Sequence, residues 1–212
     1  MAYVLGLIYT DGNLHLRKTR SGYEMGVLSF AQKDKELVEK MLKLMKCDAK
    51  IRFRKRRVLE NITAGELYYF SIGNNDLAND LRRLGVTPKK SLSMKFPEIP
   101  TDYLSHFVHG FFDGDGSVYL ANKKFIRITL LSGSYDFIEA LNYKLRDAGF
   151  PLRRIYGGYK SQKNAHFIRY TSHKQALEYF NFLYRGVSSE MYYERKHQIF
   201  LGYFEKKVDQ VK

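Results

Sequence analysis

The chain is poor in cysteine and in long apolar runs. Its 212 residues include one cysteine, Cys47, which excludes a disulfide framework or a zinc site built from several thiolates and is typical of a reducing compartment. The longest apolar runs, such as residues 3–9, are far shorter than the roughly 18 residues of a membrane span. The N-terminus lacks the basic flank and cleavage site of a signal peptide. We therefore expect an intracellular protein without a membrane partner, in a bacterial or archaeal cytoplasm or an organelle matrix.

Acidic residues are scarce relative to basic ones. The chain has 36 Lys and Arg against 22 Asp and Glu, a net charge of +14. Such an excess favours polyanionic partners, and without a membrane segment nucleic acid is the favoured one. Hydrophobic residues make up 44% of the chain and charged residues 27%, values typical of globular proteins, so disorder over most of the length is excluded.

An internal repeat divides the chain. Residues 4–12 (VLGLIYTDG) and 108–116 (VHGFFDGDG) both follow the pattern apolar-x-Gly-apolar-apolar-x-x-Asp-Gly, with Asp11 and Asp115 104 positions apart. After each motif, apolar residues recur at helical spacing, in residues 33–44 and 133–145. A further pair of helices is predicted at residues 77–84 and 176–183, each after a capping-type segment. The chain is therefore expected to consist of two related halves.

Strands are predicted between these helices. Segments rich in aromatic or branched residues occur at the ranges 26–30, 51–56, 67–72, 125–130 and 166–170. Two of the four prolines, Pro97 and Pro100, lie between the repeats and predict a boundary. We expect an α+β protein with two domains, residues 1–98 and 99–212, each running helix, two strands, helix, two strands, helix.

Each motif predicts a short helix that ends at Asp-Gly, with the glycine in the left-handed conformation that often closes a helix C-terminus. Gly6 and Gly110 remove the side chain from one helix face, so the two helices can pack with their backbones nearly in contact. Asp11 and Asp115 would then meet at helix ends that already carry about half a negative charge each. Such carboxylates repel unless a cation or proton intervenes, and hard oxygen ligands suit Mg²⁺. One motif alone would more simply be a helix end, whereas two favour metal-dependent phosphodiester hydrolysis.

The paired motifs resemble the LAGLIDADG signature of homing endonucleases, and the resemblance covers the whole chain. The second copy, residues 109–116, is close to consensus, whereas the first has Tyr9 in place of its first acid. The resemblance implies two pseudo-symmetric αββαββα halves whose curved antiparallel sheets form a saddle over double-stranded DNA. It also implies a monomer, active in intron homing, that cleaves both strands of a long non-palindromic target across the minor groove and leaves a short cohesive overhang.

The resemblance further implies the metal site. Asp11 and Asp115 would be the catalytic acids and would bind Mg²⁺, for which Mn²⁺ or Ca²⁺ can substitute. The backbone carbonyls just before these acids, those of Thr10 and Gly114, would also be ligands.

Other positions of the implied active site surround the metal. Gln32 stands where the family has a polar residue that positions water, and an offset of 100 places Ser132 at the matching point of the second half. One lysine in each half would neutralise charge that develops on the phosphate. We select Lys90 and Lys196, although Lys89, Lys95 and Arg195 are neighbouring competitors.

Basic residues alternate along the predicted strands. In residues 51–56 the arginines are expected on one sheet face and Ile51 and Phe53 on the other. A run of charge is often only a solvated face, but here the alternation recurs in both halves, and twisted ribbons can enter the major groove, where arginine recognises guanine. The predicted DNA-binding residues are His15, Arg17, Arg52, Arg54, Arg56, Arg127, Arg154, Tyr156, Lys160 and Arg169.

Two alternatives remain open. A maturase of the same fold would bind intron RNA, and a DNA-binding regulator would keep the fold without the chemistry. Retention of both acids, Asp11 and Asp115, argues against the regulator. A nuclease embedded in an intein is disfavoured because no splicing segment flanks the motifs and the first motif begins at residue 4.

Overall fold

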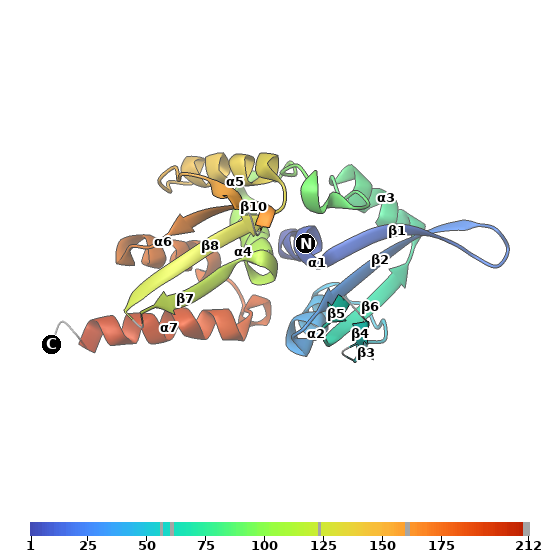
Figure 1. Ribbon diagram of the computed structural model, residues 1–212, viewed down its shortest axis with the longest axis horizontal. Coiled ribbons are helices and arrows are strands. Elements are labelled where there is room, and N and C mark those ends of the chain that lie inside the picture. The colour runs from blue at the N-terminus through green and yellow to red at the C-terminus, as the bar shows by residue number, and fades with distance from the viewer. Residues whose placement is uncertain (56, 60–61, 123, 160–161, 210–212) are drawn as a thin grey trace.

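The computed structural model describes residues 1–55, 57–59, 62–122, 124–159 and 162–209 (Figure 1). Its first half contains α1 (Ala2–Asp11), β1 (Gly12–Lys18), β2 (Glu24–Gln32), α2 (Lys35–Leu44), β3 (Arg52–Arg54), β4 (Arg57–Leu59), β5 (Ile62–Ala64), β6 (Leu67–Gly73), α3 (Asn75–Arg83) and the 3₁₀ turn η1 (Lys90–Leu92). Its second half contains η2 (Thr101–Tyr103), α4 (Leu104–Asp115), β7 (Ser117–Ala121), β8 (Phe125–Ser132), α5 (Tyr135–Asp147), β9 (Tyr156–Tyr159), β10 (Gln162–Tyr170), α6 (His173–Tyr184), η3 (Ser189–Met191) and α7 (Glu194–Asp209).

The two halves repeat one topology. Each contains a four-stranded antiparallel sheet, in the orders β1-β2-β6-β3 and β7-β8-β10-β9, and β4 pairs with β5 in a separate hairpin. This arrangement confirms the predicted α+β class with αββαββα halves. The division into domains at residue 98 stays a prediction. In the described part of the chain, no helix is long and apolar enough to cross a membrane.

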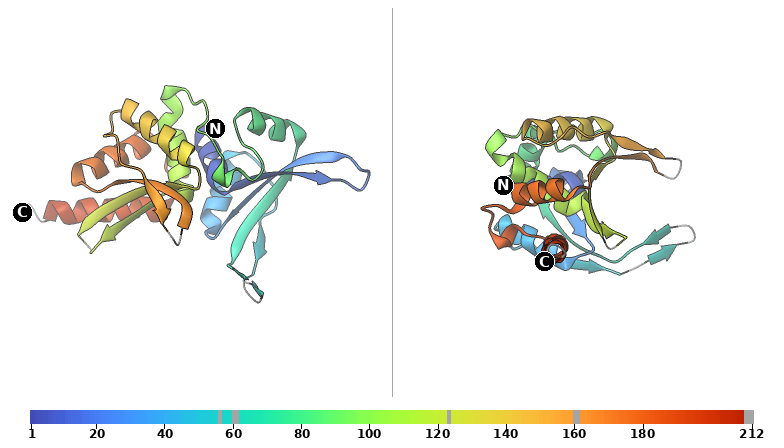
Figure 2. Two further views of the ribbon diagram at one scale, coloured as in Figure 1. Left: turned by 45° about the horizontal axis from the view of Figure 1, so that its top comes forward. Right: turned by 90° about the vertical axis from the view of Figure 1, so that its left-hand side faces the viewer.

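Each sheet has a covered face and an open face. In the first sheet Leu14 pairs with Leu28, and both side chains are buried under the helices. Their neighbours His15 and Ser29 lie on the opposite face, because successive side chains of a strand alternate. The helices lie on one side of the molecule and both sheets open toward the other (Figure 2). The open faces are therefore available to one extended partner.

α1 and α4 form the centre of the core. Most residues of both helices are buried, on all sides of each helix, whereas a surface helix buries only one apolar face. α2 and α5 are amphipathic and cover the sheets with one apolar face, through residues such as Leu37, Met41, Phe137 and Leu141. The two motif helices are thus the shared core that joins the halves.

The predicted conformation of the motif glycines is wrong. Gly12 has φ −78° and ψ 138°, and Gly116 has φ −72° and ψ 159°, so both are extended rather than left-handed. The chain turns from each helix directly into a strand, which requires extended backbone. Glycine is needed there for space, since an added Cβ would lie 2.6 Å from the Ile8 carbonyl oxygen at Gly12 and 2.6 Å from the Phe112 carbonyl oxygen at Gly116.

Candidate active site

Close packing of α1 on α4 places both motif aspartates at one end of the helix pair. A Cβ added at Gly6 would lie 2.6 Å from the Phe111 nitrogen, and one at Gly110 would overlap the Tyr3 carbonyl oxygen. At the ends of the helices, a Cβ on Gly114 would lie 2.9 Å from Asp11 Oδ2. The carboxyl of Asp11 therefore lies directly against the last turn of α4, which carries Asp115.

Asp11 is held by hydrogen bonds from its own half. Gln32, at the end of β2, donates from Nε2 to Asp11 Oδ2 at 2.8 Å, and Thr10 donates from Oγ1 to the same oxygen at 3.0 Å. Burial still raises the pKa of Asp11, although these two bonds and the nearby Lys90 act in the opposite direction. The side chain is thus oriented, and its charge is only partly compensated.

Asp115 has fewer partners. No hydrogen bond to its carboxylate comes from the part of the chain that the structure describes. Burial is the main cause that raises its pKa to about 6, and the charge of Asp11 adds to this effect. Lys90 and Lys196 act in the opposite direction. The residue is nonetheless exposed to solvent. It therefore offers carboxylate oxygens that an external cation can reach.

Two buried lysines lie beneath the aspartates. Lys90 is 5% exposed and donates from Nζ to the Gly12 carbonyl at 2.5 Å and to that of Thr10 at 3.4 Å. It follows Lys89, whose φ of 57° turns the backbone into the left-handed region before η1. Burial lowers the pKa of Lys90, while Asp115 and Asp11 favour its charged form.

Lys196 occupies the matching place in the second half. It is 5% exposed, and its Nζ donates to the carbonyls of Phe112 at 2.5 Å, Gly116 at 2.6 Å and Asp113 at 2.9 Å. Burial lowers its pKa to about 8. Each lysine thus satisfies carbonyls at the C-terminus of a motif helix, where a cation is favoured by the helix dipole.

The residues present fit a hard divalent cation. Among the described residues no cluster of three or more His, Cys, Asp or Glu side chains forms a metal site. The available donors are the carboxylates of Asp11 and Asp115 and nearby backbone carbonyls, including that of Gly114. An all-oxygen donor set with two carboxylates and room for water is typical of Mg²⁺. The raised pKa of Asp115 shows that the nearby lysines only partly compensate its charge, which is consistent with a cation there.

The polar positions that precede α2 and α5 differ between the halves. Gln32 reaches Asp11, whereas Ser132 is buried and its Oγ accepts a hydrogen bond from the Ser134 nitrogen at 3.1 Å. No hydrogen bond in the described part of the chain joins Ser132 to Asp115. The structure therefore brings Gln32 into the site and leaves Ser132 as part of the turn into α5.

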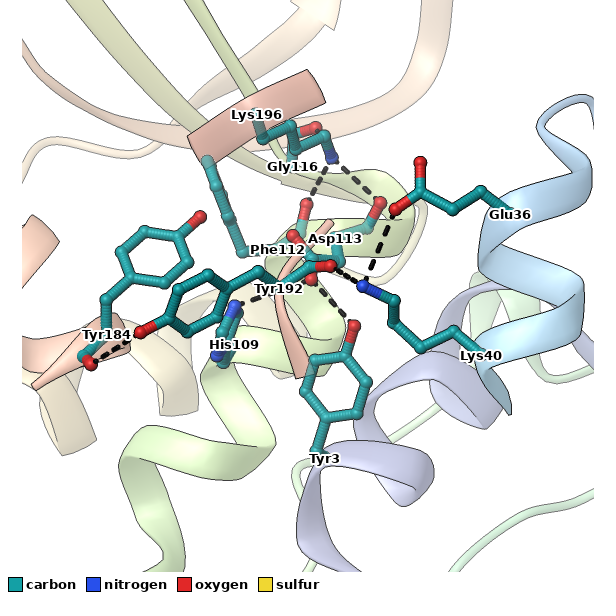
Figure 3. Close-up of polar contacts among 10 residues, drawn as sticks. All are labelled: Tyr3, Glu36, Lys40, His109, Phe112, Asp113, Gly116, Tyr184, Tyr192 and Lys196. Carbon is teal, nitrogen blue, oxygen red and sulfur yellow. Dashed lines mark hydrogen bonds and ion pairs between the residues drawn. The ribbon is translucent and has the colours of Figure 1, made fainter. Parts of the chain in front are cut away.

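A buried polar network missed by the sequence interpretation lies behind Lys196 (Figure 3). Asp113, the first acid of the second motif, is 1% exposed and accepts a hydrogen bond from the Tyr3 hydroxyl at 2.7 Å. His109 Nε2 lies 3.4 Å from the same carboxyl oxygen. Burial raises the pKa of Asp113 to about 7 and lowers that of His109 to about 3. Tyr3 and Asp113 thus link α1 to α4 across the two halves.

A second link joins the halves beside this network. Lys40 on α2 donates to the Tyr192 carbonyl in the segment before α7, and it pairs with Glu36 at 3.5 Å. Lys43 on the same helix pairs with Glu190 at 2.7 Å. The position of Asp113 in the motif could have indicated its place between the helices. No sequence signal relates Lys40 to residue 192, because 152 positions separate them.

Most predicted DNA-binding residues lie on the open faces of the sheets. Strand register places His15, Arg17, Arg52 and Arg54 on the open face of the first sheet. Arg127, Tyr156 and Arg169 share the open face of the second sheet, and the Arg154 guanidinium lies 5.5 Å over the Tyr156 ring. Arg56 and Lys160 fall outside the described residues.

Comparisons with known proteins agree with this architecture. Residues 102–183 match the family model described as a LAGLIDADG-like domain. I-DmoI, in a complex with DNA and Mn, aligns with a TM-score of 0.60 and 15% identity over 88% of this chain and 97% of its own. I-AabMI, bound to uncleaved DNA, aligns with a TM-score of 0.60 and 14% identity over 98% of this chain and 91% of its own.

The fold is therefore that of single-chain LAGLIDADG homing endonucleases, and the resemblance seen in the sequence is confirmed. Among curated proteins, the chain is 33% identical over 121 residues to the probable translation initiation factor IF-2 of Methanocaldococcus jannaschii. That match covers 54% of this chain and 10% of the other protein, so the chain spans about a tenth of that relative's length.

Proposed function

We propose that this chain is a site-specific DNA endonuclease that hydrolyses both strands of a long duplex target with Mg²⁺. The observation that carries the proposal is the meeting of two motif aspartates with two buried lysines at the end of a helix pair. Like charges at adjoining helix C-termini are costly, and such an arrangement is typical of a site that binds a cation and an anionic substrate. The open faces of two sheets beside it suit a duplex, and the relatives bound to DNA have the same fold.

We assign each residue a role that agrees with its contacts. Asp11 and Asp115, with the carbonyls of Thr10 and Gly114, would hold Mg²⁺, which supplies Lewis-acid activation of water and stabilises the leaving oxygen. Gln32 orients the Asp11 carboxylate and can hold a water beside it. Lys90 and Lys196 offset negative charge that increases at the phosphate in the transition state. The chain carries both halves, so a monomer is sufficient and the two half-sites can differ in sequence.

Selection followed by mutation tests this proposal. A randomised duplex library is incubated with the purified protein and Mg²⁺, the cut ends are sequenced, and the selected target is cloned into a plasmid. We expect the wild type to linearise that plasmid. Asp11→Asn and Asp115→Asn should abolish linearisation while their gel-shift affinity in Ca²⁺ stays within a few fold. Full linearisation by either variant would overturn the shared-metal mechanism. Binding of duplex DNA by the wild type without any cutting in Mg²⁺ or Mn²⁺ would overturn the proposal that the chain is a nuclease.

A further inference from the structure

Arg169 on the open face of the second sheet is held in place by the protein. Its Nε donates to Thr129 Oγ1 at 3.3 Å across the β8–β10 pair, and Thr129 is only 8% exposed. The guanidinium also lies 4.8 Å over the Phe167 ring, which stacks on Tyr156 at 5.4 Å. A hydrogen bond and a ring contact together fix both the direction and the plane of this guanidinium.

Arg127 is held in a similar way on the same face. It pairs with Tyr119 across the β7–β8 ladder, donates from Nη1 to the Tyr119 hydroxyl at 3.1 Å and lies 5.7 Å over that ring. Both Arg127 and Arg169 are half-buried. Among the described residues, each contact leaves one edge of the guanidinium without a hydrogen-bond partner, the Nη1–Nη2 edge of Arg169 and the Nε–Nη2 edge of Arg127.

The arginines of the first sheet are in a different situation. Arg17 at the end of β1 and Arg52 and Arg54 on the three-residue strand β3 are all exposed. Within the described residues, no side-chain hydrogen bond, ion pair or ring contact holds their guanidinium groups. These side chains therefore keep their rotamer freedom in the unbound protein.

This difference separates two kinds of DNA contact. Two parallel hydrogen bonds to guanine O6 and N7 require a guanidinium in one plane and one direction, so a side chain fixed beforehand loses little entropy on binding. A mobile arginine loses that entropy when it is confined to one base, and it can neutralise phosphate from many positions.

We propose that Arg127 and Arg169 determine sequence specificity, each by recognising a guanine, whereas Arg17, Arg52 and Arg54 bind phosphates. The inference rests on the proposed binding of duplex DNA, and it does not depend on cleavage. It assigns the sharpest base preferences to the half-site under the second sheet.

Equilibrium binding measures this difference without cleavage. A target is selected by binding in Ca²⁺, and affinities for it and for all its single-base variants are measured at several salt concentrations. Arg169→Lys keeps the charge but loses the bidentate geometry, so discrimination at one guanine should fall about 5- to 150-fold with an unchanged salt slope. Arg54→Lys is the matched control and should change neither the base discrimination nor the salt slope. Arg54→Ala should weaken binding to all the DNA variants alike and reduce the slope by about 0.9.

The variant Thr129→Val tests whether the hydrogen bond from Arg169 to Thr129 orients the guanidinium or only stabilises the fold. It keeps Arg169 and the volume at position 129 but removes the hydrogen bond, so it should reduce discrimination at the same base as Arg169→Lys with a near-normal melting temperature. Uniform weakening of all variants by Arg169→Lys, or loss of a base preference in Arg54→Lys, would overturn the inference while DNA binding stands. If the wild type binds no duplex at all, both this inference and the proposed function are wrong.

Discussion

Asp115 is a carboxyl whose ionisation the folded protein opposes. Its pKa rises from 3.8 to about 6 because the surrounding protein and the charge on Asp11 disfavour the anion. The folded state therefore binds this proton more tightly than the unfolded chain does. The resulting contribution to stability is fully present below about pH 4 and is lost as the pH rises through about 6.

Removal of this charge should stabilise the protein without metal. We expect Asp115→Asn to raise the free energy of unfolding at pH 7.5 by roughly 1 kcal/mol, a value that allows for solvent screening at this exposed side chain. The variant should therefore melt at a higher temperature than the wild type. The difference should vanish near pH 4, where the wild-type carboxyl is also neutral. Thermal melts in chelator at both pH values measure the effect. An equal difference at both pH values would show that charge is not its source.

At the scale of single residues, the sequence predicted positions but not their contacts. Lys90 was selected because the resemblance implies one such lysine in each half, and the structure adds that its buried Nζ donates to the Gly12 carbonyl. Gln32 and Ser132 looked alike in position, yet an amide reaches a neighbouring carboxylate whereas a hydroxyl, two atoms shorter, bonds its own turn. Side-chain reach within a folded site depends on local backbone geometry that a repeat pattern does not contain.

Helices and strands with one apolar face were predicted well. The helix expected at residues 33–44 is α2 at Lys35–Leu44, since Leu37, Val38, Met41 and Leu42 are all buried. The hairpin β4–β5 has strands of only three residues, too short for a periodic signal. α7 was also missed, because one of its buried positions is Lys196, a residue that interrupts the apolar pattern.

The helix pair α1 and α4 depends on its two glycines. A Cβ at Gly6 or Gly110 would meet backbone atoms of the other helix, which cannot move aside as a side chain can. We expect Gly6→Ala and Gly110→Ala to lose about 1 to 3 kcal/mol of stability, and the Val versions more, with cleavage falling on the order of a hundredfold as the aspartates separate.

Gly202 provides the matched control for this prediction. It lies inside α7, and an added Cβ would meet no atom within 4 Å. Gly202→Ala should therefore be neutral or stabilise the protein by up to about 1 kcal/mol, because alanine is the better helix former. Urea unfolding and plasmid cleavage of the four motif variants and this control measure both effects. Unchanged stability in Gly110→Val would mean that the helices do not pack at these glycines.

At the scale of the whole molecule, a charge of +14 and two open sheet faces predict binding dominated by phosphate contacts. If about eight to ten phosphates are neutralised, log K against log[salt] should fall with a slope of roughly −7 to −9. Fluorescence anisotropy with the selected duplex between low and physiological salt gives the slope. A slope near zero would contradict a large contact surface along the DNA backbone.

The hydrogen bond between Tyr3 and Asp113 makes each half depend on the other. The repeat aligns Tyr3 with Phe107 and Tyr9 with Asp113, so donor and acceptor belong to different halves. A homodimer of the second half would place each buried Asp113 against a phenylalanine, which cannot donate a hydrogen bond, and losing the tyrosine donor at a buried carboxyl is costly. In the first half Tyr9 instead donates to the Leu84 carbonyl within its own half. The two halves are therefore complementary rather than interchangeable at this contact, and a symmetric version of the helix pair would require changes on both helix faces.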